Sequence, residues 1–190
     1  MNVKTWGIAA SILLAAIFSM GFTKQDTSKI RVKGSTTVDP ISRKLANAYQ
    51  SHKKIKIEVD STGSHSGLDA LISGECDIAE SSSEASPEYI AKAEKVGVVL
   101  KAFLIAHDYI LPIVHPKNKA TDISIEQLHD IYTGKITSWE SITNQKTPMV
   151  VVSRDETSGT GDVWKDVLGI DGDILADKDL QKSNSGVLAF

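Results

Sequence analysis

The chain has 190 residues, of which 41% are hydrophobic and 24% charged, and its formal net charge at pH 7 is −3. This composition is typical of a globular protein with one large domain or two small lobes. It excludes the strongly basic surface needed to bind nucleic acid or anionic lipid. Any anionic ligand therefore has to be held by local donors and dipoles, because overall charge does not attract it.

Residues 1–21 have the pattern of a secretory signal peptide. Lys4 is followed by an uncharged stretch with an apolar core at 8–18, and small residues end it at Gly21. We expect cleavage near Gly21, a disordered lead-in at 22–29 and a mature protein in the periplasm. An uncleaved membrane anchor is the alternative, since the uncharged stretch is only slightly shorter than a membrane span.

The chain contains a single cysteine, Cys76, which excludes an intrachain disulfide. Cys76 lies far from the end of the signal peptide, so it cannot carry an N-terminal lipid anchor, and we predict that it is a small buried core residue. None of the five histidines has a spacing typical of metal ligands. We expect no metal and no cofactor.

The first half of the mature chain alternates strands with helices. The expected strands are 30–32, 55–59 and 77–80, and the expected helices are 37–49, 64–74 and 86–95. Thr37 or Asp39 is the expected N-cap of the first helix, with Pro40 in its first turn. Its apolar residues fall on one helical face: Ile41, Leu45, Ala48 and Tyr49.

The second half begins with two apolar runs, 98–106 and 109–114, which are typical of strands covered on both faces. A capping box at Ser124 starts a helix that ends at Gly134. A strand at 150–152 and a helix at 158–168 follow, and the tail has a weak helical pattern at 175–180. The alternation predicts an α/β protein. We assign 30–106 to a first lobe and 107–190 to a crossover and a partial second lobe.

A strand runs into a turn of glycine and hydroxyl residues and then into a helix at 34–37, 63–67 and 158–161. The N–H groups and dipole of a helix N-terminus favour an anion, and Arg154 adds a planar fork for two oxygens. One such turn is equally compatible with an ordinary helix cap. Three at the carboxyl ends of strands indicate one small-anion site.

Other nucleotide and hydrolase motifs are missing from the sequence. There is no G-x-x-x-x-G-K-[ST] phosphate loop, no G-x-S-x-G nucleophile elbow and no H-E-x-x-H. Trp139 and Trp164 are interpreted as core or lobe-packing residues. A phosphate-ester hydrolase stays open as the weakest of the functional alternatives.

The motifs together resemble those of the phosphate-binding proteins of bacterial ABC importers, which are type 2 periplasmic binding proteins. The matching segments keep the family's order from about residue 30 to 168: Gly34-Ser35-Thr36-Thr37-Val38 with Pro40, Thr62-Gly63-Ser64-x-Ser66-Gly67, Gly74-x-x-Asp77-Ile78-Ala79 with Ser81-Ser82, ILPIVHP at 110–116, Leu128-x-x-Ile131-Tyr132-x-Gly134-Lys135-Ile136-Thr137-x-Trp139, and Arg154-x-x-x-Ser158-Gly159-Thr160.

This resemblance implies two α/β lobes that close on dehydrated inorganic phosphate. Its carried-over donors are Thr36, Thr37 and Ser64 on the first lobe and Arg154, Ser158, Gly159 and Thr160 on the second, with Ser82 as a further ligand and Ser35 as a possible neighbour. It also implies a non-enzymatic monomer that delivers phosphate to a membrane ABC permease and has no nucleic-acid partner.

Two departures from the family keep alternatives open. Ser82 stands where some members have an aspartate that accepts the phosphate proton, so another tetrahedral oxyanion is an alternative ligand. Ser83 and Glu84 replace the arginine and proline of many relatives. Residues 183–188 resemble the middle of the second lobe, which suggests a truncated chain and the alternative of a fragment that does not bind.

Overall fold

The computed structural model describes residues 29–172, 174 and 178–190. The predicted signal peptide and residues 22–28 of the predicted lead-in lie outside this range. Lys29 was expected in the lead-in but is the first residue of strand β1 (Lys29–Gly34). Among the described residues, no helix combines the length and apolar character that a membrane span requires.

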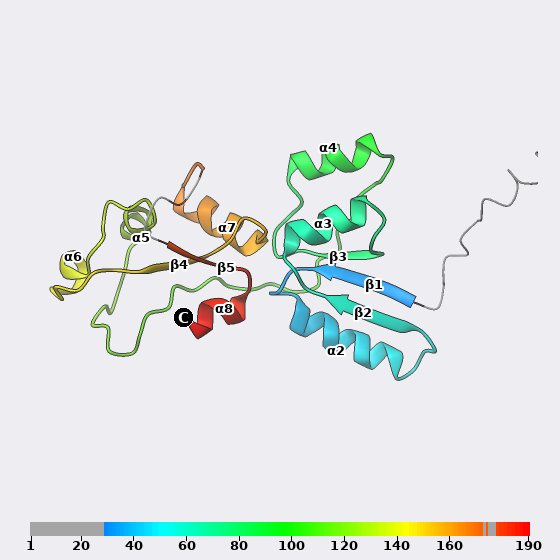
Figure 1. Cartoon of the computed structure of the whole chain (residues 1–190), viewed down its shortest axis with the longest axis horizontal. Coiled ribbons are helices and arrows are strands. Elements are labelled where there is room, and N and C mark those ends of the chain that lie inside the picture. Colours follow the sequence, from blue (N-terminus) through cyan, green and yellow to red (C-terminus); the bar gives the residue numbers. More distant parts are fainter. Residues whose placement is uncertain (1–28, 173, 175–177) are drawn as a thin grey trace, which may run out of the picture.

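The first lobe is a three-stranded parallel sheet with helices on both sides (Figure 1). Strand β1 lies in the middle, between β2 (Lys56–Asp60) and β3 (Ile78–Glu80). Helix α2 (Asp39–Gln50) contacts β2, while α3 (Ser64–Ile72) contacts β1 and β3, and α4 (Pro87–Lys95) packs outside α3. The helices connect successive parallel strands, as the alternating pattern of the sequence predicts.

Small and β-branched residues fill the first lobe. Val32 of β1 is buried and stands in register with Val59 of β2 and Ile78 of β3. Leu68 of α3 is also buried, as is Cys76 between α3 and β3, which confirms the prediction for that cysteine. This core aligns the carboxyl ends of β1 and β3 beside the start of α3.

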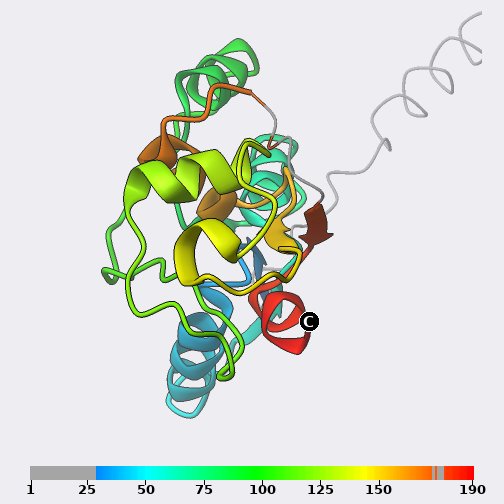
Figure 2. The same cartoon turned by 90° about the vertical axis from the view of Figure 1, so that its left-hand side faces the viewer.

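The second lobe contains two parallel strands, β4 (Val151–Arg154) and β5 (Lys178–Gln181). It also contains α5 (Ile125–Tyr132), the short α6 (Glu140–Thr143), α7 (Gly159–Leu168) and α8 (Asn184–Ala189). Figure 2 shows α5 and α6 at the end of the molecule that lies farthest from the first lobe.

Aromatic and aliphatic residues hold α5 and α7 together. Trp164 and Leu168 of α7 pack with Leu128 of α5, and the rings of Tyr132 and Trp164 meet edge to face at 5.6 Å. The N-terminus of α5 is closed by the predicted capping box, in which Ser124 Oγ accepts from the Gln127 N–H at 3.1 Å. Trp164 is thus the core residue that the sequence suggested.

The two apolar runs at 98–106 and 109–114 were predicted to be strands, and this is wrong. Residues 98–124 pass from one lobe to the other without a helix or strand (Figure 1). Val99, Phe103 and Tyr109 are 89%, 72% and 84% exposed. An apolar run becomes a strand only when a neighbouring strand pairs with it, and none of the described strands does so here.

The apolar face of α2 is largely exposed, since Ile41, Leu45 and Tyr49 are 40%, 57% and 49% exposed. Two other local predictions also differ from the structure. The N-cap of α2 is Val38, without a side-chain hydrogen bond, and is neither Thr37 nor Asp39. Residues 178–181 form strand β5 and no helix, because pairing with β4 outweighs their weak helical pattern.

Glu80, at the carboxyl end of β3, carries a buried carboxyl group in the first lobe. Its side chain is 4% exposed, and neither carboxylate oxygen has a well-formed hydrogen bond among the described residues. Burial raises the pKa of Glu80 above its ordinary value of 4.5, and the charge of Asp39 adds to this, while Ser42 and Arg43 oppose it. Folding therefore favours the protonated acid.

We predict that Glu80→Gln stabilises the protein at pH 7 by about 1 kcal/mol. Because the pKa of Glu80 is higher in the folded state, wild-type stability falls as pH rises through the unfolded and then the folded pKa. A neutral amide removes this loss, so the gain should vanish near pH 4. Urea unfolding at both pH values measures it, with the exposed Glu84→Gln as the control. An equal gain at both pH values would contradict the assignment.

Candidate functional site

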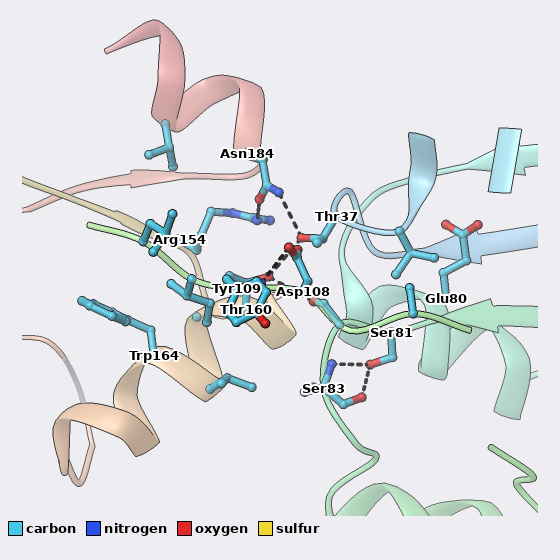
Figure 3. Close-up of a pocket in the computed structure, with 18 of the residues that line it drawn as sticks. Thr37, Glu80, Ser81, Ser83, Asp108, Tyr109, Arg154, Thr160, Trp164 and Asn184 are labelled. Carbon is cyan, nitrogen blue, oxygen red and sulfur yellow. Dashed lines mark hydrogen bonds between the residues drawn. The ribbon is translucent and has the colours of Figure 1, made fainter. Parts of the chain in front are cut away.

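The three glycine- and hydroxyl-rich turns meet between the two lobes, at the carboxyl ends of β1, β2 and β4. The turn after β1 leads into α2, that after β2 into α3, and that after β4 into α7. Figure 3 shows Thr37 from the first lobe facing Thr160 and Arg154 from the second. The structure thus brings together the predicted side chains from both halves of the chain.

The first turn is fixed by a close approach of backbones. Gly34 has a φ of +143°, and a Cβ at this position would lie 2.1 Å from the carbonyl oxygen of Glu80, so only glycine fits. Ser35 is 2% exposed, and its Oγ accepts from the N–H groups of Thr37 and Val38 at 3.1 and 3.4 Å. Ser35 therefore orders the turn, and its place beside a bound anion stays a prediction.

Four hydroxyl groups form a continuous chain across the lobes. Thr37 Oγ1 lies 3.0 Å from Thr160 Oγ1, which donates to Ser82 Oγ at 3.1 Å, and Ser82 Oγ lies 3.2 Å from Ser64 Oγ. The Ser82 N–H also donates to Ser64 Oγ at 3.2 Å. Since each hydroxyl can donate or accept, this hydroxyl chain can direct several donors at one anion.

Arg154, the last residue of β4, is half-buried beside this chain. Its Nε donates to the carbonyl of Gln181 at 3.1 Å, one terminal nitrogen donates to the carbonyl of Lys182 at 3.0 Å, and the other donates to Asn184 Oδ1. No ion pair among the described residues includes Arg154. Burial lowers the pKa of its guanidinium, against the charge of Asp155, yet arginine stays protonated in proteins.

Asn184 is a residue of this region that the sequence reasoning missed. It begins α8 and lies between Arg154 and Thr37 (Figure 3): its Oδ1 accepts from Arg154, and its Nδ2 donates to Thr37 Oγ1 at 3.1 Å. The preceding Ser183 gave a helix-start signal, since a serine followed by Asn-Ser-Gly matches a cap. Nothing in the local pattern placed it beside residues 37 and 154.

The remaining predicted residues have different surroundings. Thr36 Oγ1 is buried and has no hydrogen-bond partner among the described residues. Ser158, the N-cap of α7, accepts from the Gly161 N–H at 3.2 Å, so it shapes the helix start. Gly159 is buried against the first lobe, where a Cβ would lie 2.5 Å from Ser83 Oγ.

Other contacts hold the two lobes together around the hydroxyl chain. His65 Nε2 on α3 lies 2.7 Å from Asp162 Oδ2 on α7. The backbone N–H of His65 also donates to the Thr157 carbonyl at 3.2 Å. Gly63 has a φ of +119°, and a Cβ there would lie 2.6 Å from Thr157 Oγ1. The two helix N-termini, α3 and α7, therefore face each other at close range.

Three of the four hydroxyl residues, Thr37, Ser82 and Thr160, line a much larger groove. The groove has a volume of about 2520 Å³ and is lined by residues 100–115 and by the exposed face of α2. A site for a small ligand usually measures about 300–1,000 Å³. Its lining includes Thr37, Ser82, Arg154, Thr160 and Asn184, which bring polar groups from both lobes together.

The converging turns thus lie between the two lobes of an α/β fold. Residues 22–186 match the family model described as a PBP superfamily domain, and the chain belongs to this family. It has the type 2 periplasmic-binding-protein fold, as the resemblance implied.

Named relatives make this likeness more specific. The chain is 30% identical over 202 residues to the phosphate-binding protein PstS of Staphylococcus saprophyticus. This alignment covers 98% of this chain and 63% of the relative. It is 34% identical over 120 residues to phosphate-binding protein PstS 2 of Streptococcus agalactiae, covering 63% of this chain and 39% of the relative. The chain thus spans less than two thirds of these relatives.

Solved structures give the same likeness. A Clostridium perfringens protein, assigned as the substrate-binding protein of a phosphate ABC transporter and solved with bound phosphate, superposes with a TM-score of 0.76 at 30% identity. An ABC-type phosphate transport receptor from Vibrio cholerae gives 0.59 at 27% identity. They match 85% and 84% of this chain, and the chain covers 65% of each.

We predict that Gly159→Ala destabilises the closed arrangement by about 1–3 kcal/mol, the usual cost of overpacking. The added methyl would overlap Ser83 and Ser64, so the serines or the lobes have to move apart. Urea unfolding followed by tryptophan fluorescence measures the loss, and small-angle scattering measures the separation of the lobes. Asp166→Ala, exposed on the same helix, is the control. Unchanged stability and dimensions for Gly159→Ala would contradict the predicted contact.

Proposed function

We propose that this protein binds inorganic phosphate between its two lobes and delivers it to a membrane ABC permease. Arg154 carries the argument, because it is a half-buried cation without an ion pair among the described residues and lies beside hydroxyl groups from both lobes. A guanidinium beside several donors suits a tetrahedral oxyanion. The named relatives, described as phosphate-binding proteins, favour phosphate.

The buried hydroxyl of Thr36 supports the same proposal. A buried polar atom without a partner costs about 1–3 kcal/mol, so proteins seldom keep one without a use. Thr36 lies in the turn between β1 and α2, next to Thr37 of the hydroxyl chain. We assign its Oγ1 as a donor to the bound anion.

The choice of anion depends on Ser82. The Ser82 hydroxyl lies between those of Ser64 and Thr160 in the hydroxyl chain. A hydroxyl can accept the proton of monohydrogen phosphate or donate to an unprotonated oxygen. A carboxylate here would reject an anion without a proton, whereas a hydroxyl does not. Sulfate or molybdate is therefore the second candidate ligand, and we expect weaker rejection of sulfate than a carboxylate gives.

The proposal includes binding without chemistry by a monomer in the periplasm. The ligand would be held by hydrogen bonds and one guanidinium, which needs no nucleophile. The pattern of the first 21 residues favours export by a cleaved signal peptide. Transfer to a permease is the role that the assignments of the matched transport proteins suggest.

We predict that phosphate binds the chain from residue 22 onward and that Arg154→Gln weakens binding about 100-fold, because a charge-assisted bond pair to the anion is lost. Isothermal titration with phosphate, sulfate and molybdate measures both the affinity and the choice of anion. Arg43→Gln, an exposed arginine on α2, is the charge-matched control and should bind like the wild type. No heat from the wild type with phosphate would overturn the proposed function.

We predict opposite effects of Thr36→Val on stability and on binding. The substitution removes a buried hydroxyl that has no partner, so thermal stability without phosphate should stay equal or rise. It also removes a donor to the anion, so phosphate should bind about 10-fold more weakly. Thermal melting with and without phosphate reads both effects. Unchanged phosphate affinity would show that Thr36 does not contact the ligand.

A further inference from the structure

We propose that Asn184 is a positioning residue of the anion site, which fixes the Arg154 guanidinium and connects it to Thr37 on the opposite lobe. The inference rests on the proposed function. It concerns a side chain that neither the turn motifs nor the family resemblance pointed to. Its amide is the described group that links the arginine of the second lobe directly to a hydroxyl of the first lobe.

The chemistry of the amide matches both neighbours. Oδ1 accepts a hydrogen bond from Arg154, while Nδ2 donates to Thr37 Oγ1 at 3.1 Å (Figure 3). Asparagine offers an acceptor and a donor on one planar group. Aspartate could accept from the arginine but not donate to the threonine, and an aliphatic side chain could do neither.

The neutrality of the amide matters as much as its shape. A carboxylate at residue 184 would form an ion pair with Arg154 and neutralise the positive charge that the anion needs. The carbonyl groups of Gln181 and Lys182 hold the guanidinium in the same way, without opposing charge. The arginine is thus oriented by three neutral acceptors, which leaves its charge to the ligand.

Helix α8 does not need Asn184 for its own formation. Ser183 is the N-cap of α8, and its Oγ accepts from the Gly186 N–H at 3.0 Å. The amide of Asn184 points away from that cap, toward Arg154 and Thr37 (Figure 3). Its hydrogen bonds therefore serve the contact between the lobes.

Asn184 also couples the arginine to lobe closure. Thr37 bonds both Asn184 Nδ2 and Thr160 Oγ1, so the amide and the hydroxyl chain share one residue of the first lobe. When the lobes separate, the bond to Thr37 is lost and the amide becomes free to rotate. The amide still accepts from Arg154 but is no longer held from the first lobe, so all three acceptors of the guanidinium are fixed only when the lobes are together.

Three variants test this role by isothermal titration with inorganic phosphate: Asn184→Asp, Asn184→Ala and the control Ser185→Asp. Ser185, the next residue of α8, is exposed, so Ser185→Asp adds the same charge to the same helix turn. We expect about 100-fold weaker binding for Asn184→Asp, about 10-fold for Asn184→Ala and no more than about twofold for Ser185→Asp. Without phosphate, the melting temperature of Asn184→Asp should equal or exceed that of the wild type.

The order of the two Asn184 variants separates positioning from packing. Aspartate has the shape of asparagine, so a residue that only packs would tolerate Asp better than Ala, and that order would overturn the inference. Binding within twofold of wild type for both variants would also overturn it. If Asn184→Asp fails to fold, Asn184→Ala decides alone. Wild-type protein that binds no phosphate overturns the proposed function as well, whereas wild-type binding with unaffected variants overturns this inference only.

Discussion

The orientation of the Arg154 guanidinium is the constraint on which the rest of the site depends. Its half-buried N–H groups need acceptors, and an acidic partner would cancel its charge. The turn between β5 and α8 supplies neutral acceptors through the carbonyls of Gln181 and Lys182. The pairing of β5 with β4 places that turn beside the end of β4. The last strand described thus positions a residue 27 places earlier in the chain.

The hydroxyl chain depends on a different constraint, which is the close approach of two helix N-termini. Glycines at 63 and 159 let α3 and α7 come together where any side chain would collide. Parallel strands place these helix starts at one edge of each sheet. Ser64, Ser82, Thr160 and Thr37 then reach one another because the edges of the two lobes face each other.

The sequence predicted features that local chemistry determines. Caps, turns and periodicity predicted the capping box at Ser124, the turn at Gly34 and the starts of α3 and α7. The turn at Gly34 and the two helix starts contain most of the candidate site residues. The pairing of strands that lie far apart in the sequence could not be predicted from local patterns. The runs at 98–106 and 109–114 have the composition of buried strands, but composition does not supply a neighbouring strand. Strand β5 and the place of Asn184 likewise depend on a register that only the folded lobe defines.

The segment 98–124 is the one covalent connection between the lobes in the described part of the chain. Closure is therefore an intramolecular association, in which each lobe meets the other at the effective concentration that this tether imposes. Flexible tethers give values near the millimolar range that fall as the tether lengthens. Under such a condition the His65–Asp162 pair and a few hydroxyl bonds need only modest strength to bring the lobes together. The length of residues 98–124, which touch neither Arg154 nor the hydroxyl chain through any hydrogen bond described, thus helps to set how often the whole site is assembled.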